Sequence, residues 1–290
     1  MKKYIFLFST LICMSVFAQE QPILLFPDGA PGETENLIQK DSWNGKKVGG
    51  YPVLRISNVS EPTLTFYPAP TNNNSGATII VNPGGGYHIL AYSLEGAEVC
   101  KWFNSQGVNC VLVKYRVPRR AGKEKHEAPL QDLQRTIAYT RSHASEWNID
   151  PDKIGVMGFS AGAHLAAMGS TSFNKRTYPK VDDADNISLR PDFCLLIYPA
   201  YLNGKNFSIS PELNVNAETP PTFIVQAEDD VDLLDSSIFY YYALKEVKVP
   251  ASMHLYPTGG HGYGLRNTDD LVNEWPFRAI SWLRAIGMVN

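Results

Sequence analysis

The sequence has little charge and no excess of basic residues. Charged side chains make up 19% of the 290 residues, and 26 basic residues against 29 acidic ones give a formal net charge of −3. This low charge, combined with 44% hydrophobic residues, is typical of a globular domain and argues against a disordered tail or a charged coiled coil. The balance gives no electrostatic reason to expect nucleic acid as a partner.

Cysteine is scarce, and no metal-binding spacing occurs. Of four cysteines, Cys13 lies in an N-terminal apolar run, which leaves Cys100, Cys110 and Cys194. Cys194 stands among apolar residues and is expected to be a buried thiol. A Cys100–Cys110 disulfide stays open, because the sequence gives no geometry for it. The six histidines are scattered, and neither CxxC nor HExxH is present, so we expect no metal site.

Long hydrophobic runs are lacking except at the N-terminus. Two lysines follow Met1, residues 4–17 are almost wholly apolar, and Ala18 supplies a small residue. This order predicts a secretory signal peptide over residues 1–18. A membrane anchor is the alternative, but about 14 apolar residues fall short of the ~20 that span a bilayer. We expect an exported protein, periplasmic or extracellular, that does not engage a membrane once the signal is removed.

The rest of the chain is expected to form an N-terminal irregular arm, residues 19–50, and one catalytic domain, residues 51–290. Strands alternate with helices, which indicates an α/β class with a mostly parallel sheet and helices on both faces. A hairpin of the first two strands is expected to supply antiparallel edge strands. The predicted strands are 53–57, 63–67, 77–82, 109–115, 153–158, 193–198, 222–227 and 252–256, and the predicted helices are 94–106, 129–147, 161–170, 234–245 and 273–286.

A G-x-S-x-G pentapeptide, residues 158–162, follows a predicted strand and opens a predicted helix. In that context it predicts a nucleophile elbow, in which Ser160 projects from a tight turn. Glycines on both sides let the strand and helix backbones approach closely. The strand before and the helix after favour a nucleophile over a structural serine.

A glycine-rich loop, residues 82–87, follows an earlier strand. It lacks the Lys-Ser/Thr ending of a phosphate-binding loop. Because Ser160 is the expected nucleophile, we interpret this loop as part of an oxyanion hole rather than as a flexible turn. We predict that the backbone N–H groups of Gly85, Gly86 and Ala161 form that hole.

A serine nucleophile needs a base, and the base needs a carboxylate. His261 stands among three glycines after the last predicted strand, whereas His164 and His254 are interpreted as packing residues or as residues that support the site from behind. Asp230 follows the preceding strand and is the preferred acid, with Asp229 as its rival. The order Ser, Asp, His is that of the α/β-hydrolases.

These motifs belong to a wider resemblance. Together with Lys-Tyr-Arg-Val-Pro (114–118), Ile-Tyr-Pro (197–199), Pro-Pro-Thr-Phe (220–223) and Gly-Gly-His-Gly-Tyr-Gly (259–264), they resemble the esterase/lipase branch of the α/β-hydrolases over residues 50–286. The likeness is to bacterial carbohydrate acetyl esterases, often labelled acetylxylan esterase. It implies the α/β-hydrolase fold, the triad and oxyanion roles given above, and no cofactor. Pro83 departs from relatives of the hormone-sensitive-lipase type, which carry His there.

The leading hypothesis is a secreted serine esterase that removes acetyl or other small acyl groups from carbohydrate. Its partner would be an acetylated polysaccharide or oligosaccharide, and its oligomeric state stays open. Tyr87, His88 and Tyr263 lie beside motif residues and are candidate substrate contacts, or alternatively packed rim residues. The other hypotheses are a serine peptidase, a short-chain lipase or carboxylesterase of the same fold, and an inactive carbohydrate-binding protein.

Overall fold

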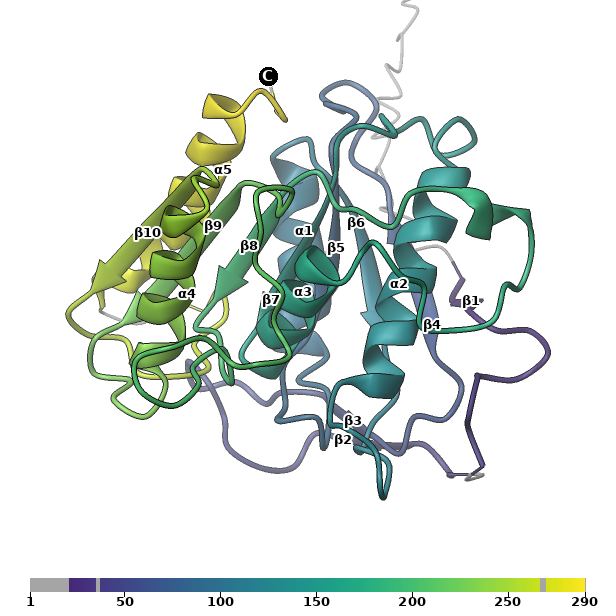
Figure 1. The fold of residues 1–290 in the computed structure, drawn as a ribbon, viewed down its shortest axis with the longest axis horizontal. Coiled ribbons are helices and arrows are strands. Elements are labelled where there is room, and N and C mark those ends of the chain that lie inside the picture. The colour runs from purple at the N-terminus through teal and green to yellow at the C-terminus, as the bar shows by residue number, and fades with distance from the viewer. Residues whose placement is uncertain (1–20, 35–36, 267–269, 290) are drawn as a thin grey trace, which may run out of the picture.

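The computed structural model describes residues 21–34, 37–266 and 270–289 (Figure 1). The expected signal peptide, residues 1–18, lies outside these residues. Across the described ranges, no helix combines the length and the apolar character that crossing a bilayer requires.

An eight-stranded sheet organises the fold, and six neighbouring strands in it are parallel (Figure 1). This confirms the predicted mostly parallel sheet. The antiparallel member is β4, which runs against both of its neighbours. In spatial order the strands are β1 (Ile23–Leu24), β4 (Thr63–Tyr67), β6 (Asn109–Lys114), β5 (Thr78–Asn82), β7 (Ile154–Phe159), β8 (Cys194–Ile197), β9 (Thr222–Ala227) and β10 (Ala251–Tyr256).

The predicted hairpin of residues 53–57 and 63–67 is wrong. β3 (Arg55–Ser57) pairs instead with β2 (Lys40–Ser42) in a separate two-stranded sheet. All five residues of β4 are buried, and the strand pairs with β1 along one edge and with β6 along the other. The segment expected to be an irregular arm thus contributes two short strands, β1 and β2.

In the described part of the chain, five α-helices cover the sheet. Helices α2 (Glu127–Ser142), α3 (Ala161–Thr171) and α4 (Leu234–Glu246) lie on one face, and α1 (Glu98–Ser105) and α5 (Trp275–Ala285) lie on the other (Figure 1). Shorter helical turns are η1 (Ser93–Ala97), η2 (Asp183–Asn186) and η3 (Leu271–Glu274). The predicted helices over 94–106 and 273–286 each begin as one of these turns and continue as an α-helix.

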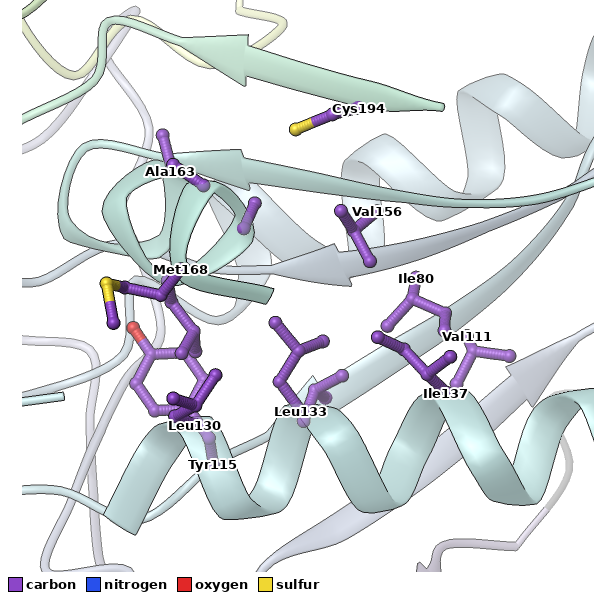
Figure 2. Close-up of a cluster of buried hydrophobic side chains, with 14 of the residues drawn as sticks. Ile80, Val111, Tyr115, Leu130, Leu133, Ile137, Val156, Ala163, Met168 and Cys194 are labelled. Carbon is purple, nitrogen blue, oxygen red and sulfur yellow. The ribbon is translucent and has the colours of Figure 1, made fainter. Parts of the chain in front are cut away.

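The strands divide their side chains between two cores because successive residues of a strand point to opposite faces. Ile80 packs in the core under α2 and α3, whereas Ile79 and Val81 pack in the core under α1 and α5. Figure 2 shows the first core, where the apolar stripe of α2 faces the strands. Its labelled members include Leu130, Leu133 and Ile137 of α2, with Ile80, Val111 and Val156 of the sheet.

A buried ion pair attaches α2 to the end of β6. Asp132 accepts a hydrogen bond from the backbone N–H of Arg116 at 2.8 Å and from its Nε at 2.9 Å. Both side chains are almost fully buried. The same guanidinium donates to the carbonyl oxygen of Pro31 at 2.8 Å. Arg116 therefore connects the N-terminal arm, the sheet and α2.

Asp132→Asn should destabilise the fold by about 3–5 kcal/mol, because it leaves the Arg116 charge buried without a counter-ion. Urea unfolding followed by circular dichroism measures the change. The matched control is Glu127→Gln on the same helix, which removes an exposed pair with Lys123 and should cost under about 1 kcal/mol. Equal unfolding midpoints for the two variants would contradict the structural role of the pair.

Candidate active site

Ser160 lies in a sharp turn between β7 and α3, with φ of 52° and ψ of −118°. The turn has no room for side chains at its two flanking glycines. A Cβ atom on Gly158 would lie 2.0 Å from the carbonyl oxygen of Gly162, and one on Gly162 would lie 2.1 Å from the carbonyl oxygen of Asn82. The glycines therefore allow β7, α3 and the end of β5 to touch, and this contact holds Ser160 in a sparsely populated backbone region.

The structure brings Ser160, His261 and Asp230 together, although they are far apart in the chain. Oγ of Ser160 lies 2.8 Å from Nε2 of His261, and Nδ1 of His261 lies 2.7 Å from Oδ2 of Asp230. An ionised carboxylate only accepts, so it selects the tautomer with a proton on Nδ1. Nε2 then accepts a hydrogen bond from the Ser160 hydroxyl.

All three side chains lie beyond the carboxyl ends of parallel strands. Ser160 follows β7 directly, Asp230 comes three residues after β9, and His261 comes five residues after β10. Ligands of parallel sheets bind at this edge. Asp230 is buried and His261 is one-third exposed. The hydrogen-bonded series Asp230–His261–Ser160 therefore runs from the protein interior towards solvent.

The adjacent carboxylates Asp229 and Asp230 have different partners. Oδ1 of Asp229 accepts the backbone N–H of Gly260 at 2.8 Å, and Oδ2 accepts that of Gly259 at 3.3 Å. Asp230 contacts the imidazole of His261 and also accepts from Nε2 of Gln226 at 3.2 Å. The geometry thus places Asp230 on the histidine and Asp229 on the loop that carries it.

The glycine-rich loop presents free backbone donors beside Ser160. Gly84 lies so close that a Cβ atom on it would be 2.9 Å from Cβ of Ser160, and its own N–H is taken by Glu95 at 2.7 Å. Within the described ranges, no group accepts the N–H of Gly85 or Gly86. Ala161 is the first residue of α3, so its N–H has no acceptor inside the helix.

Two buried side chains that were not among the predicted site residues, Glu95 and Tyr198, join the loops of the site. Glu95 holds Gly84 with Oε2 and accepts the Tyr198 hydroxyl with Oε1 at 2.8 Å. The Tyr198 ring meets His261 edge to face, with centroids 4.9 Å apart, and its hydroxyl oxygen accepts the N–H of Gly264 at 3.2 Å. Burial raises the pKa of Glu95. Tyr198 belongs to the Ile-Tyr-Pro motif, but nothing local marked Glu95.

Two of the predicted substrate contacts are not supported by their positions. Tyr87 is fully buried, and its hydroxyl lies 2.8 Å from Nδ1 of His164. Tyr263 is also buried and packs against Tyr198 at 4.5 Å between centroids. Of the three predicted residues, only His88 is exposed, where its Nε2 lies 3.1 Å from a guanidinium nitrogen of Arg119.

Other titratable groups lie outside the hydrogen-bonded series of Ser160, His261 and Asp230. The thiols of Cys100, Cys110 and Cys194 are free and buried, so the structure contains no Cys100–Cys110 disulfide. His164 is buried, as its interpretation as a packing residue predicted, and burial lowers its pKa to about 4. Among the described residues, one group gathers metal-ligating atoms, namely His126, His164 and Glu212.

Comparison with known proteins identifies relatives with this architecture. The BD-FAE family matches residues 64–193. An acetylxylan esterase of Xylanibacter ruminicola is 33% identical over 74% of this chain, and endo-1,4-beta-xylanase B of Butyrivibrio fibrisolvens is 32% identical over 68%. The chain spans 46% and 34% of the lengths of these two relatives.

Solved structures extend the likeness to the whole fold. An acetyl ester-xyloside bifunctional hydrolase from Caldicellulosiruptor lactoaceticus has a TM-score of 0.73 and 30% identity, over 95% of this chain and all of that one. A thermophilic esterase from Thermogutta terrifontis, at 22% identity and a TM-score of 0.68 over 80% of this chain and 90% of that one, shares the fold. The chain therefore belongs to the esterase/lipase family of α/β-hydrolases.

Proposed function

We propose that the chain is an exported serine esterase that removes small acyl groups, chiefly acetyl, from carbohydrate such as xylan-type polysaccharide or oligosaccharide. The observation that carries this proposal is the hydrogen-bonded series Asp230–His261–Ser160 beside the free N–H groups of Gly85 and Gly86. The substrate class is supported by two relatives whose names contain acetylxylan and acetyl ester-xyloside. Export is supported by the pattern of residues 1–18.

In the first half of the reaction, Oγ of Ser160 attacks the ester carbonyl carbon while its proton passes to Nε2 of His261. Asp230 stabilises the resulting imidazolium. The negative charge that develops on the carbonyl oxygen is stabilised by the N–H groups of Gly85, Gly86 and Ala161. The bond to the sugar oxygen then breaks, and that oxygen takes the proton from His261.

In the second half, water replaces the sugar. His261 accepts a proton from the water, whose oxygen attacks the acyl carbon of the serine ester. Collapse of the second tetrahedral intermediate breaks the acyl–Oγ bond and returns the proton to Ser160. The products are a carboxylic acid and the free enzyme. The residues that carry out these steps need no cofactor.

The character of segment 172–190 argues for small acyl substrates and against a lipase that acts on long lipid chains. It is polar, and it is fixed to α2 by a two-pronged ion pair from Arg135 to Asp182, at 2.8 and 2.6 Å. A lipase lid is apolar and mobile. This segment is instead polar, and the ion pair with Arg135 ties it to α2. The alternatives that remain are a short-chain carboxylesterase or serine peptidase, and an inactive carbohydrate-binding protein.

A substrate panel separates these functions. The folded chain should hydrolyse p-nitrophenyl acetate much faster than p-nitrophenyl octanoate, leave proline p-nitroanilide intact, and release acetate from acetylated xylan digests. Faster octanoate or anilide turnover would favour the lipase or the peptidase. If folded protein hydrolyses no ester, the enzymatic proposal fails.

Ser160→Ala should lower kcat by about 10⁴-fold or more, because the attacking oxygen is lost while the fold keeps its turn. Turnover of p-nitrophenyl acetate and the circular dichroism spectrum measure the two effects. Ser142→Ala, a change at an exposed serine at the end of α2, is the control and should retain full activity. Near-normal turnover by Ser160→Ala would remove this residue from the mechanism.

Asp230→Asn should lower kcat by about 10⁴-fold, since an amide does not stabilise the imidazolium or hold its tautomer. Asp229→Asn should cost far less, because an amide oxygen still accepts one of the two loop N–H groups. Both variants change one carboxylate oxygen to nitrogen, so they are matched in size. If Asp229→Asn proves the more damaging, the acid is Asp229 and the proposed assignment is wrong.

A further inference from the structure

Three metal-ligating side chains from separate elements meet one helical turn after Ser160. His164 lies on α3, His126 directly precedes α2, and Glu212 lies between β8 and β9. One ligand atom of each lies within 4.8 Å of those of the other two. Their sequence separations, 38 and 48 residues, match no local metal motif.

The spacing suits a small tetrahedral ion. Two protein ligands bound at 2.0–2.1 Å to one zinc ion lie about 3.4 Å apart. Nε2 of His164 and Oε1 of Glu212 are 3.3 Å apart, so this pair already has that separation. A nitrogen of His126 lies within 4.8 Å of the other two ligand atoms, so a shift of at most about 1.4 Å brings it to the same spacing.

His126 carries the observation that points to a ligand. Its Nδ1 atom is buried, and it has no hydrogen-bond partner among the described residues. Buried polar atoms are almost always paired with protein, water or an ion. The side chain itself is half-buried, which leaves a route for an ion from solvent.

The other two ligands have the outer partners that metal sites use. The second ring nitrogen of His164, Nδ1, lies 2.8 Å from the Tyr87 hydroxyl, and the second carboxylate oxygen of Glu212 accepts the hydroxyl of Ser210. Such contacts orient histidine and carboxylate ligands toward an ion. With a metal on Nε2, the His164 proton moves to Nδ1 and points at the Tyr87 oxygen.

We propose that His126, His164 and Glu212 bind a divalent transition-metal ion of the Zn²⁺ class, with water as the fourth ligand. Two imidazoles and one carboxylate form a donor set that zinc commonly takes. The site goes beyond the proposed esterase function and does not depend on it. The Tyr87 hydroxyl contacts His164, and Tyr87 follows Gly86 directly. A bound ion would therefore stabilise the glycine-rich loop through His164 and Tyr87.

Lys125 competes for the same position. Its Nζ lies 3.0 Å from Oε1 of Glu212 and 5.4 Å from the centroid of the Tyr201 ring. A zinc ion has to displace this ammonium group, and the partly exposed lysine side chain is free to swing toward solvent. Removal of the Lys125 ammonium group is therefore expected to tighten zinc binding if the cluster is a metal site. It is not expected to do so if the cluster is a purely structural network.

The test measures Zn²⁺ binding by the full chain carrying no histidine tag. Elemental analysis after dialysis against ZnCl₂ should give one zinc per chain, and zinc should raise the Tm. Competition with a chromophoric chelator should show that His126→Ala weakens binding at least 10-fold, whereas Lys125→Met tightens it. His143→Ala, at the other end of α2, should bind as the parent does.

Three outcomes would overturn the proposal. These are no zinc above the level of a control protein, unchanged affinity in His126→Ala, or weaker binding in Lys125→Met. If His126→Ala does not fold, the direction of the Lys125→Met effect still decides. Esterase activity is not the readout, so loss of this proposal and loss of the proposed function are separate results.

Discussion

The site depends on a backbone contact that only glycine permits. The carbonyl oxygens of Gly162 and Asn82 occupy the places where side chains of Gly158 and Gly162 would lie. Because the turn, the helix α3 and the end of β5 touch there, the Ser160 hydroxyl and the glycine-rich loop come to the same point. Asn82 fixes the contact further, since its Nδ2 donates to the carbonyl oxygen of Met157 at 2.9 Å. The N–H groups of that loop and of Ala161 gain their positions from this packing.

Much of the fold, and the proximity of Ser160, Asp230 and His261, were predictable from the sequence. Buried parallel strands appear as continuous apolar runs, and the residues just after them meet at one edge of the sheet. Ser160, Asp230 and His261 follow three such strands, so their order in the chain was enough to place them together. Which of Asp229 and Asp230 contacts His261 could be seen only in the coordinates, because neighbouring side chains differ only in the direction in which the loop sends them.

What was missed depends on contacts between distant residues. Tyr87 and Tyr263 adjoin motif residues in sequence, yet their rings are buried, and no local pattern distinguishes a packed tyrosine from one at a binding surface. The partners of Glu95 lie 11 and 103 residues away. The pairing of β4 with β6 rather than with β3 joins segments that are far apart in the sequence. The group of His126, His164 and Glu212 was likewise missed, because its members lie 38 and 48 residues apart in the sequence.

The position of Glu95 has a mechanical consequence. One buried carboxylate holds the backbone of Gly84 on one side and the ring that supports His261 on the other. The glycine-rich loop and His261 are thereby connected through Glu95 and Tyr198, and neither moves without changing a contact inside the protein. Under the proposed esterase function, a change in the size of the accepted acyl group would therefore have to come from the outer loops, because this connection fixes the inner side of the site.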